Sequence, residues 1–544
     1  MREGFRRRCC RPEMWIAGGA AVAILAIGCG GSGGRAAASG TDTSSVSAQP
    51  AVSPSPIAVP GGSGTTGGGT APVTSSDPML ASWQTQYSGR YARVVERTGG
   101  QAVATWPSAG LRNTGGGQAK PAYSDIQQVG YSASYVYING TGLASHQMGP
   151  WYDEMGNIFG NWPSNQNYLH RFPRHPQPAT SKTTNGLGPL GRWVNGVAFF
   201  NLLDGFSYDA SRGTEGGGPG QSSGGLWMRN AVVVEQPTFD ASNAHQPQNG
   251  EYHYHDNPVA LRYQLGDNVA FDAGSGRYRE DTSRLHHSPI LGWSNDGYPI
   301  YGPYGYASAT NAGSGIRRMV SGFVLRDGTQ GAADLRQTGR HSLAKWAAAL
   351  HGVSTALAAS QYGPNVTTQY TLGRYVEDFD FLGDLGQTQG RDFDLDVYNG
   401  RYCVTPEYPG GTYAYFVTIN ADGSPAFPYV IGRQWYGTPS GGAVPQITET
   451  VTMYKNAGPG SAVQVTVTGS GSGKQLAWTS VEGGIYKIEG TADGGKTWTG
   501  LASNVTSQGL KTTYAVGGLG GVSVSSYRVT LTALAPYDST GRQR

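Results

Sequence analysis

Short hydrophobic runs bounded by turn residues occupy most of the chain between residues 79 and 437. The runs are rich in Tyr, Val, Ile and Phe, and turn residues such as Asn-Gly and Asp-Gly separate them, which is typical of strands joined by tight turns. The clearest runs are SYVYING (134–140), NGVAFFNLLDG (195–205), NAVVVEQPTF (230–239) and YAYFVTINADG (413–423). We expect each run to form a strand, so the pattern predicts a mainly β domain.

One segment departs from this pattern. Residues 341–360, HSLAKWAAALHGVSTALAAS, are rich in Ala and Leu. Leu343, Trp346, Leu350 and Leu357 recur within them at roughly helical spacing. The segment therefore predicts a genuine helix, so that the large domain should hold one or two helices in all.

Strand-like runs also fill residues 440–544. They are AVQVTVT, KQLAWTS, GGIYKIEG, KTWTGL and VSSYRVTLTAL, with ADGGK as a hairpin turn. Their spacing of about ten residues is the rhythm of a small β-sandwich. The glycine-rich YGTPSGGAVP near residue 440 separates this module from the larger domain of residues 79–439. Terminal modules of this kind support or bind more often than they catalyse.

The N-terminus has another composition. The basic MREGFRRRCCRPEM precedes WIAGGAAVAILAIG and then Cys29. The apolar run is shorter than the roughly 18 to 20 residues that span a bilayer, so residues 1–28 predict a signal peptide. We expect Cys29 to carry a lipid, with an ordinary cleaved signal as the alternative. Residues 29–78 are mainly Gly, Ser, Thr, Ala and Pro, which predicts a disordered tether. The protein should then be exported and anchored to a membrane, on the periplasmic face or the cell surface.

Net charge limits the class of partner, and cysteine content limits the number of disulfide bonds. Residues 1–28 hold five Arg and two Glu, and this excess of three equals the formal net charge of the whole chain. The remainder is nearly neutral, so nothing favours a nucleic acid as a partner. Cys403 is the one cysteine beyond Cys29, which excludes a disulfide framework. We expect Cys403 to be a small buried hydrophobic residue.

The segment NGEYHYHDNP contains two of the ten histidines in the chain. Side chains alternate along a strand, so Glu251, His253 and His255 share one face and Tyr252 and Tyr254 the other. Two histidines at i and i+2 lie about 6.6 Å apart along the strand, close enough to bind one ion. The alternative is a half-buried strand with tyrosines inside and polar residues outside. That alternative does not explain why the polar residues are histidines.

A second segment, GGTYAYFVTI, aligns with NGEYHYHDNP as a faint internal repeat. It keeps both tyrosines, as Tyr413 and Tyr415, but has Ala414 and Phe416 in place of the histidines. The tyrosine face is therefore what the strand needs for folding. The histidines are an addition, and this favours a functional role for them.

Five sequence blocks together resemble the YHYH-domain family of exported bacterial proteins. They are TGLASHQMGPW, RWVNGVAFFNLLDGFSY, EYHYHDNPVALR, HHSPILGWSNDGYPIYGPYGY and YNGRYCVTPEYPGGTYAYFVTINADGSPAFPYVIG. The resemblance implies a YHYH domain over residues 79–439 and implies no reaction. Family members often carry a second YHYH pair, and in this chain residues 413–416 stand in its place.

A metal site needs at least a third ligand. His245 lies eight residues before His253, and His287 lies in HSP, which matches a block of the family where the adjacent His286 does not. We expect His287 or His245 to complete a site for a divalent transition metal, because neutral imidazole suits Zn, Cu, Fe and Ni. Glu251 is a weaker candidate, as a general base.

DFDLDVYNG places Asp392, Asp394 and Asp396 at alternate positions, loosely like a calcium loop. It lacks the glycine and glutamate of such a loop, so a solvated strand face is the favoured interpretation and calcium the weaker one. The chain has neither a Gly-x-Ser-x-Gly nor a His-Glu-x-x-His motif. Three functions stay open: a tethered metal-binding protein, a surface protein that binds polysaccharide or matrix, and a structural component that contacts envelope proteins.

Overall fold

The computed structural model describes residues 77–83, 92, 94–95, 102–103, 124–153, 155–157, 160–217, 225–272, 274–456, 462–463, 465–470, 473–479, 484–507, 511–516 and 524–534. The signal peptide of residues 1–28, Cys29 and all but the last two residues of the tether lie outside this part. In the part described, no helix is long and apolar enough to cross a membrane.

The fold is mainly β, as predicted, with 38% of the described residues in strands and 11% in helices. The described residues contain five short α-helices: α1 (Pro78–Ala81), α2 (Ala231–Glu235), α3 (Val259–Gln264), α4 (Leu335–Thr338) and α5 (Lys345–His351). They also contain four 3₁₀ turns: η1 (Gln236–Thr238), η2 (Ala359–Gln361), η3 (Val376–Asp378) and η4 (Leu382–Leu385). Helix α5 confirms the helix predicted within residues 341–360 but is shorter, because Gly352 adopts a left-handed conformation with φ of 65° and ends it.

The strand prediction for NAVVVEQPTF is wrong. Its valines form α2, and η1 follows directly. Pro237 has no N–H group for a sheet ladder, and the N–H of Gln236 donates to the carbonyl of Val232 within the helix. The strand preference of three valines is therefore overridden, and the chain turns at a place that becomes important for the site.

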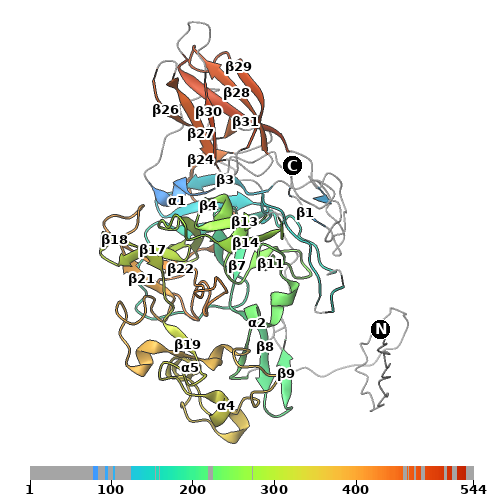
Figure 1. Ribbon diagram of the computed structural model, residues 1–544, viewed down its shortest axis with the longest axis vertical. Coiled ribbons are helices and arrows are strands. Elements are labelled where there is room, and N and C mark those ends of the chain that lie inside the picture. The colour runs from blue at the N-terminus through green and yellow to red at the C-terminus, as the bar shows by residue number, and fades with distance from the viewer. Residues whose placement is uncertain are drawn as a thin grey trace, which may run out of the picture. The chain divides into compact units, whose positions relative to one another are not determined.

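A sheet of eight strands runs through the larger domain. Its strands are β6 (Pro189–Trp193), β7 (Ala198–Phe200), β11 (Ala244–His245), β12 (His253–Tyr254), β15 (Ile290–Ser294), β16 (Pro299–Tyr301), β21 (Gly400–Cys403) and β22 (Thr412–Phe416). Their order across the sheet is β11-β12-β7-β6-β15-β16-β22-β21, and several of them are labelled in Figure 1.

The same pattern of pairing is met from either end of this sheet. Strands β6 and β15 pair antiparallel in the middle. On one side β7 pairs parallel with β12, and on the other β16 pairs parallel with β22. The outermost strands, β11 and β21, each pair antiparallel with these neighbours. The sheet thus consists of two similar halves, and β12 and β22, which carry the two aligned sequence segments, occupy equivalent places.

A second sheet of five strands belongs to the same domain. In order across the sheet, its strands are β23 (Gly442–Ala443), β5 (Tyr168–Pro173), β4 (Tyr135–Gly140), β3 (Ile126–Tyr131) and β24 (Thr452–Asn456). A three-stranded sheet joins β8 (Leu203–Asp209) to β9 (Thr214–Gly217) and β10 (Met228–Asn230). Two-stranded ribbons complete the domain: β1 (Val94–Val95) with β2 (Ala102–Val103), β13 (Val269–Asp272) with β14 (Arg277–Glu280), β17 (Tyr304–Ser308) with β18 (Asn311–Arg318), and β19 (Phe323–Leu325) with β20 (Phe379–Phe381).

Seven short strands lie near the C-terminus, after β24. They are β25 (Ala462–Val463), β26 (Thr466–Thr468), β27 (Gln475–Thr479), β28 (Gly484–Thr491), β29 (Thr499–Thr506), β30 (Lys511–Ala515) and β31 (Ser526–Leu534). They form a four-stranded and a three-stranded sheet, and residues of both sheets share one core that includes Leu476, Trp478 and Ile488. This arrangement confirms the predicted β-sandwich.

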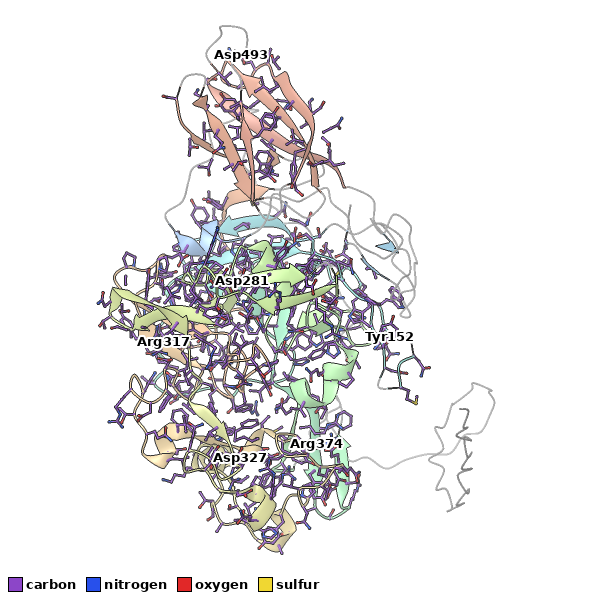
Figure 2. All side chains as sticks on the ribbon, in the orientation of Figure 1. Tyr152, Asp281, Arg317, Asp327, Arg374 and Asp493 are labelled. Atoms are coloured by element: carbon purple, nitrogen blue, oxygen red, sulfur yellow. The ribbon has the colours of Figure 1, made fainter. Side chains whose placement is uncertain are left out.

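The predicted hairpin turn of the sandwich joins β28 to β29. The carboxylate of Asp493, labelled in Figure 2, accepts hydrogen bonds from the N–H and the hydroxyl of Thr497 at 2.9 and 2.6 Å. Gly494 and Gly495 both adopt positive φ, at 70° and 93°. This conformation is open to glycine at little cost, which explains the Gly-Gly pair in ADGGK.

The domain boundary near residue 440 stays a prediction, but β23 and β24 bear on it. Both strands follow residue 440, yet they pair with β5 and β3 of the larger domain. Val451 is buried against Tyr137 and Leu169 of the same sheet. We therefore propose that the larger domain ends after Asn456.

A fragment of residues 79–456 should accordingly be more stable than one of residues 79–439. The shorter fragment lacks both strands and the burial of Val451, which alone contributes about 1.5 to 3 kcal/mol. We expect its free energy of unfolding, measured by urea denaturation, to be lower by at least about 2 kcal/mol. Equal unfolding free energies for the two fragments would place the boundary near residue 440.

Candidate metal site

Three buried histidines converge at the β11–β12 edge of the central sheet. One ring nitrogen each of His245, His253 and His255 lies within 4.8 Å of the other two. The Nε2 atoms of His253 and His255 are 3.0 Å apart. The three residues are only 3 to 7% exposed, so they form a compact group in the interior.

Strand pairing explains this convergence. His245 of β11 lies directly opposite His253 of β12 in the antiparallel register, and opposite residues point to the same face of a sheet. His255 lies two residues beyond His253 and returns to that face. Of the two residues expected to complete the site, the structure brings His245 to the pair.

The Nδ1 atoms of the two YHYH histidines are fixed by backbone carbonyl groups. Nδ1 of His253 lies 2.8 Å from the carbonyl oxygen of Glu251, and Nδ1 of His255 lies 2.6 Å from that of Asn201. A carbonyl oxygen can only accept a hydrogen bond, so both Nδ1 atoms carry a hydrogen. Nε2 is consequently the atom of each ring that can bind a metal.

A hydroxyl group likewise fixes the position of the ring hydrogen on the third histidine, His245. Thr238 donates its hydroxyl hydrogen to the carbonyl oxygen of Glu235 at 2.7 Å. Its oxygen must then accept from Nδ1 of His245, which lies 2.7 Å away. Nε2 of His245 is buried and has no hydrogen-bond partner among the described residues. All three rings therefore direct Nε2 toward a common point.

Glu235 brings a carboxylate to this point. Its Oε2 atom lies 2.9 Å from Nε2 of His255 and 3.5 Å from Nε2 of His245. The side chain is 28% exposed, but its Oε2 atom is itself buried. Glu235 is the last residue of α2, the helix that replaces a predicted strand. The strand interpretation of its segment gave no reason to consider it.

Burial and charge act in opposite directions on these groups. Burial lowers the pKa of His253 well below its ordinary value, and the other two histidines lower it further. Burial also lowers the pKa of His245 to about 4, against the opposing effect of Glu235. Burial alone would lower the pKa of His255 too, but Glu235 reverses this and the net shift is upward. Glu235 thus favours the charged form of His255, whereas burial favours the neutral forms of His245 and His253.

Aromatic side chains enclose the cluster. The ring of Phe200 stacks on that of His253 at a centroid distance of 3.8 Å and an angle of 14°. The ring of Phe239 meets that of His245 edge to face at 4.8 Å. These contacts exclude water from two rings and limit their rotation, so the Nε2 positions are preorganised.

Comparison with known proteins identifies the domain in which this cluster lies. Residues 169–428 match the family model described as YHYH protein. The chain carries a YHYH domain. The match covers all eight strands of the central sheet, and with it the three histidines and Glu235. No curated protein and no solved structure matches the chain.

The two halves of the YHYH domain share a buried hydrogen-bond arrangement. In the first half, Asp240 accepts from the N–H groups two and four residues later and from the hydroxyl of Tyr252 at 2.8 Å. In the second half, Asp396 accepts from the N–H groups at the same two spacings and from the hydroxyl of Tyr413 at 3.0 Å. The internal repeat predicted from the sequence is thus present at the level of single hydrogen bonds.

The two halves differ at the histidines. The place of His245 opposite His253 is taken in the second half by Arg401 opposite Ala414. The place of His255 is taken by Phe416, over whose ring the Arg401 guanidinium lies at 5.5 Å. The second half is therefore built on the same hydrogen bonds without a histidine cluster.

Other predicted residues of the YHYH domain lie outside the cluster. His287 donates from Nδ1 to the carbonyl of Ser288 at 2.8 Å, and its ring packs against Tyr301 and Tyr306. Its segment leads into β15 of the second half, so the topology separates it from β12. The carboxylate of Glu251 forms an ion pair with Arg192 at 3.1 Å and does not join the histidines.

Two further histidines, His146 and His286, also lie outside the cluster. His146 is buried, and its Nε2 atom lies 2.7 Å from the hydroxyl of Tyr254. It is thus a hydrogen-bonding residue of the core. His286 is exposed. Cys403 is buried, as expected.

The three alternate aspartates of the second half bind different partners. Asp392 pairs with its neighbour Arg391 at 2.8 Å. Asp394 accepts two hydrogen bonds from Arg317, both at 2.5 Å. Asp396 belongs to the buried hydrogen-bond arrangement described above. The three carboxylates do not converge, so neither the solvated strand face nor a calcium loop describes their arrangement in the structure.

Proposed function

We propose that the YHYH domain holds a divalent transition metal, with Nε2 of His245, His253 and His255 as three ligands and Glu235 as the fourth. The observation that carries the proposal is the set of Nδ1 hydrogen bonds. Each leaves Nε2 as the atom of its ring that can face a metal, and the three Nε2 atoms meet in a buried place. A histidine buried merely for packing has no need of this common orientation.

The spacing of the donor atoms supports a single ion. With bonds of about 2.0 to 2.1 Å to nitrogen and oxygen, the ligand atoms of a tetrahedral site lie about 3.3 Å apart. The separations here are 3.0 Å between His253 and His255 and 2.9 and 3.5 Å from Glu235 to two of the histidines. The three histidine nitrogens lie within 4.8 Å of one another, so the rings would have to draw together to complete a coordination shell.

The donor types restrict the metal. Three imidazoles and one carboxylate suit Zn, Cu, Fe or Ni, whereas calcium and magnesium prefer shells of oxygen alone. The carboxylate offsets part of the metal charge in a buried place, where an unpaired charge is costly. Imidazole binds a metal only in its neutral form, so binding should weaken as the pH falls and the histidines become protonated.

Four protein ligands fill a tetrahedral shell, which favours the holding of a metal over the activation of water at an open position. In the same proposal the chain is exported and Cys29 carries the lipid that anchors it to a membrane. The tether of residues 29–78 then gives the YHYH domain reach from that membrane.

Exchange of the YHYH histidines for the residues of the second half tests the site. The double variant His253→Ala and His255→Phe should lose stoichiometric zinc or copper, measured by elemental analysis and calorimetry on the purified protein. Its circular dichroism should stay that of the wild type, because Ala414 and Phe416 occupy the equivalent places in a folded half.

Single variants locate the third ligand. His245→Ala should weaken metal binding by at least the roughly 10- to 100-fold that the loss of even an outer partner costs. His287→Ala, the matched control, removes a partly buried histidine outside the cluster and should leave binding unchanged. A double variant that still binds one metal per chain would overturn the proposal. Loss of metal in His287→Ala but not in His245→Ala would return the third ligand to His287.

The role of Glu235 is tested by Glu235→Gln, which keeps the size of the side chain and removes its charge. We expect the affinity for Zn²⁺ to fall by about tenfold or more, because the amide is a weaker ligand and no longer offsets the metal charge. Glu251→Gln is the matched control and should bind as the wild type does. Equal affinities for Glu235→Gln and the wild type would leave the site with three protein ligands.

A further inference from the structure

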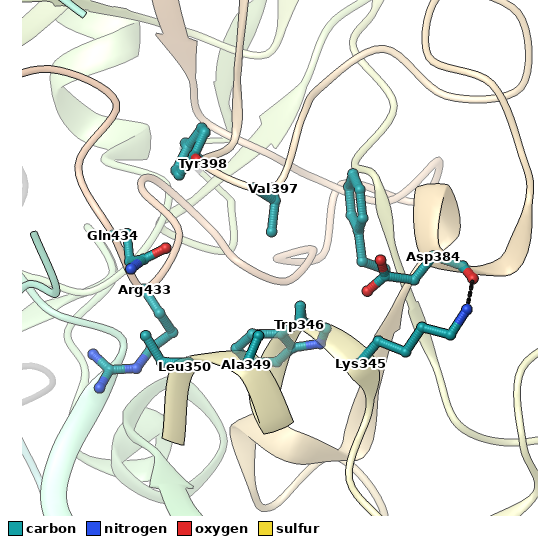
Figure 3. Close-up of a pocket in the computed structure, with 10 residues that line it drawn as sticks. Lys345, Trp346, Ala349, Leu350, Asp384, Val397, Tyr398, Arg433 and Gln434 are labelled. Carbon is teal, nitrogen blue, oxygen red and sulfur yellow. Dashed lines mark hydrogen bonds between the residues drawn. The ribbon is translucent and has the colours of Figure 1, made fainter. Parts of the chain in front are cut away.

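A cavity lies beside α5, in a part of the molecule that shares no residue with the histidine cluster. Its volume is about 460 Å³, within the range of about 300 to 1,000 Å³ that is usual for sites of small ligands. Residues from α5, β20, η4 and the segments near residues 397 and 433 line it (Figure 3). Figure 3 shows Tyr398 and Val397 on one side, facing Trp346, Ala349 and Leu350 of α5 on the other.

The aromatic walls of this cavity are fixed in place. The indole N–H of Trp346 donates to the carbonyl of Phe379 at 2.8 Å, which sets the orientation of its ring. The ring of Tyr398 lies beneath the ammonium group of Lys182, at 4.9 Å from its centroid. Phe381 adds a third ring. Rigid aromatic surfaces of this kind bind ligands at a low cost in conformational entropy.

Polar groups of both hydrogen-bonding types also line the cavity. Asp384 adds a carboxylate, whereas the guanidinium group of Arg433 is already bonded to Asn185 at 3.2 Å. Gln434 adds an amide, and the ammonium group of Lys345 donates to the carbonyl of Asp384 at 2.9 Å. A ligand with both donors and acceptors can therefore form hydrogen bonds with this lining.

The charges exclude simple ions as the preferred ligand. A small anion would meet the carboxylate of Asp384, and a small cation would meet the ammonium group of Lys345. A hydroxyl group both donates and accepts, so several hydroxyl groups on one ligand can donate to the Asp384 carboxylate and accept from the Lys345 ammonium or the Gln434 amide. The C–H faces of a sugar ring would in turn cover the aromatic walls.

We propose that this cavity binds a neutral saccharide ring. It would give the protein a contact with polysaccharide that does not depend on the metal. The saccharide site and the metal site share no residue, so each can fail experimentally without the other.

The test measures binding of glucose, galactose, N-acetylglucosamine and maltose to the full chain by saturation-transfer NMR. At least one of these saccharides should bind to the wild type. Ala349→Trp should abolish the signal, because the new indole fills the cavity without removing a polar group. Ala359→Trp, at an exposed position outside the cavity, is the matched control and should bind as the wild type does.

Two further variants test the contribution of Asp384 to saccharide binding and the independence of that binding from the metal. Asp384→Asn should weaken saccharide binding by about tenfold, the usual effect of losing a hydrogen bond to a charged group. The double variant His253→Ala and His255→Phe should bind saccharide normally, even though it should lose the metal. The proposal is overturned if no saccharide binds or if Ala349→Trp binds as the wild type does. It is also overturned if inorganic phosphate, instead of a saccharide, binds in a manner that Ala349→Trp abolishes.

Discussion

The buried hydrogen bond between Tyr252 and Asp240 is the interaction on which the histidine cluster depends. The same carboxylate accepts the N–H groups of Ser242 and Ala244 and so shapes the turn that leads into β11. The bond therefore ties the turn before His245 to the residue before His253. With the two strands held in this register, the two histidines lie opposite each other.

The same hydrogen bond in the second half shows which residues both halves need for folding. Asp396 and Tyr413 repeat the bond, and Asn243 and Asn399 adopt the same left-handed conformation at equivalent turns, with φ of 69° and 68°. Yet the second half has neither a histidine cluster nor an equivalent of Glu235 in such a cluster. The hydrogen bonds on the tyrosine face are what both halves need. The other face of these strands is free to differ. In the first half the three histidines lie there, with Glu235 of α2 beside them.

How much of the structure the sequence predicts depends on how far apart along the chain the interacting residues lie. The alternation of strands and the common face of His253 and His255 depend only on neighbouring residues, so the pattern of YHYH predicted them. The repeat was visible because Tyr413 and Tyr415 preserve its buried face. Pairing between distant segments is set by topology, and the sequence could not choose between His245 and His287. Glu235 was missed because local preference favours a strand for its valines, whereas Pro237 and the tertiary contacts impose a helix.

The location of the metal itself tests the account most directly. Crystals of the protein loaded with Zn²⁺ or Cu²⁺ can be measured on both sides of the absorption edge of that metal, which maps its position. The account predicts one strong anomalous peak per chain, bonded to Nε2 of His245, His253 and His255 and to an oxygen of Glu235. A peak bonded to Nδ1 atoms, a peak beside His287, or no ordered peak at full loading would contradict it.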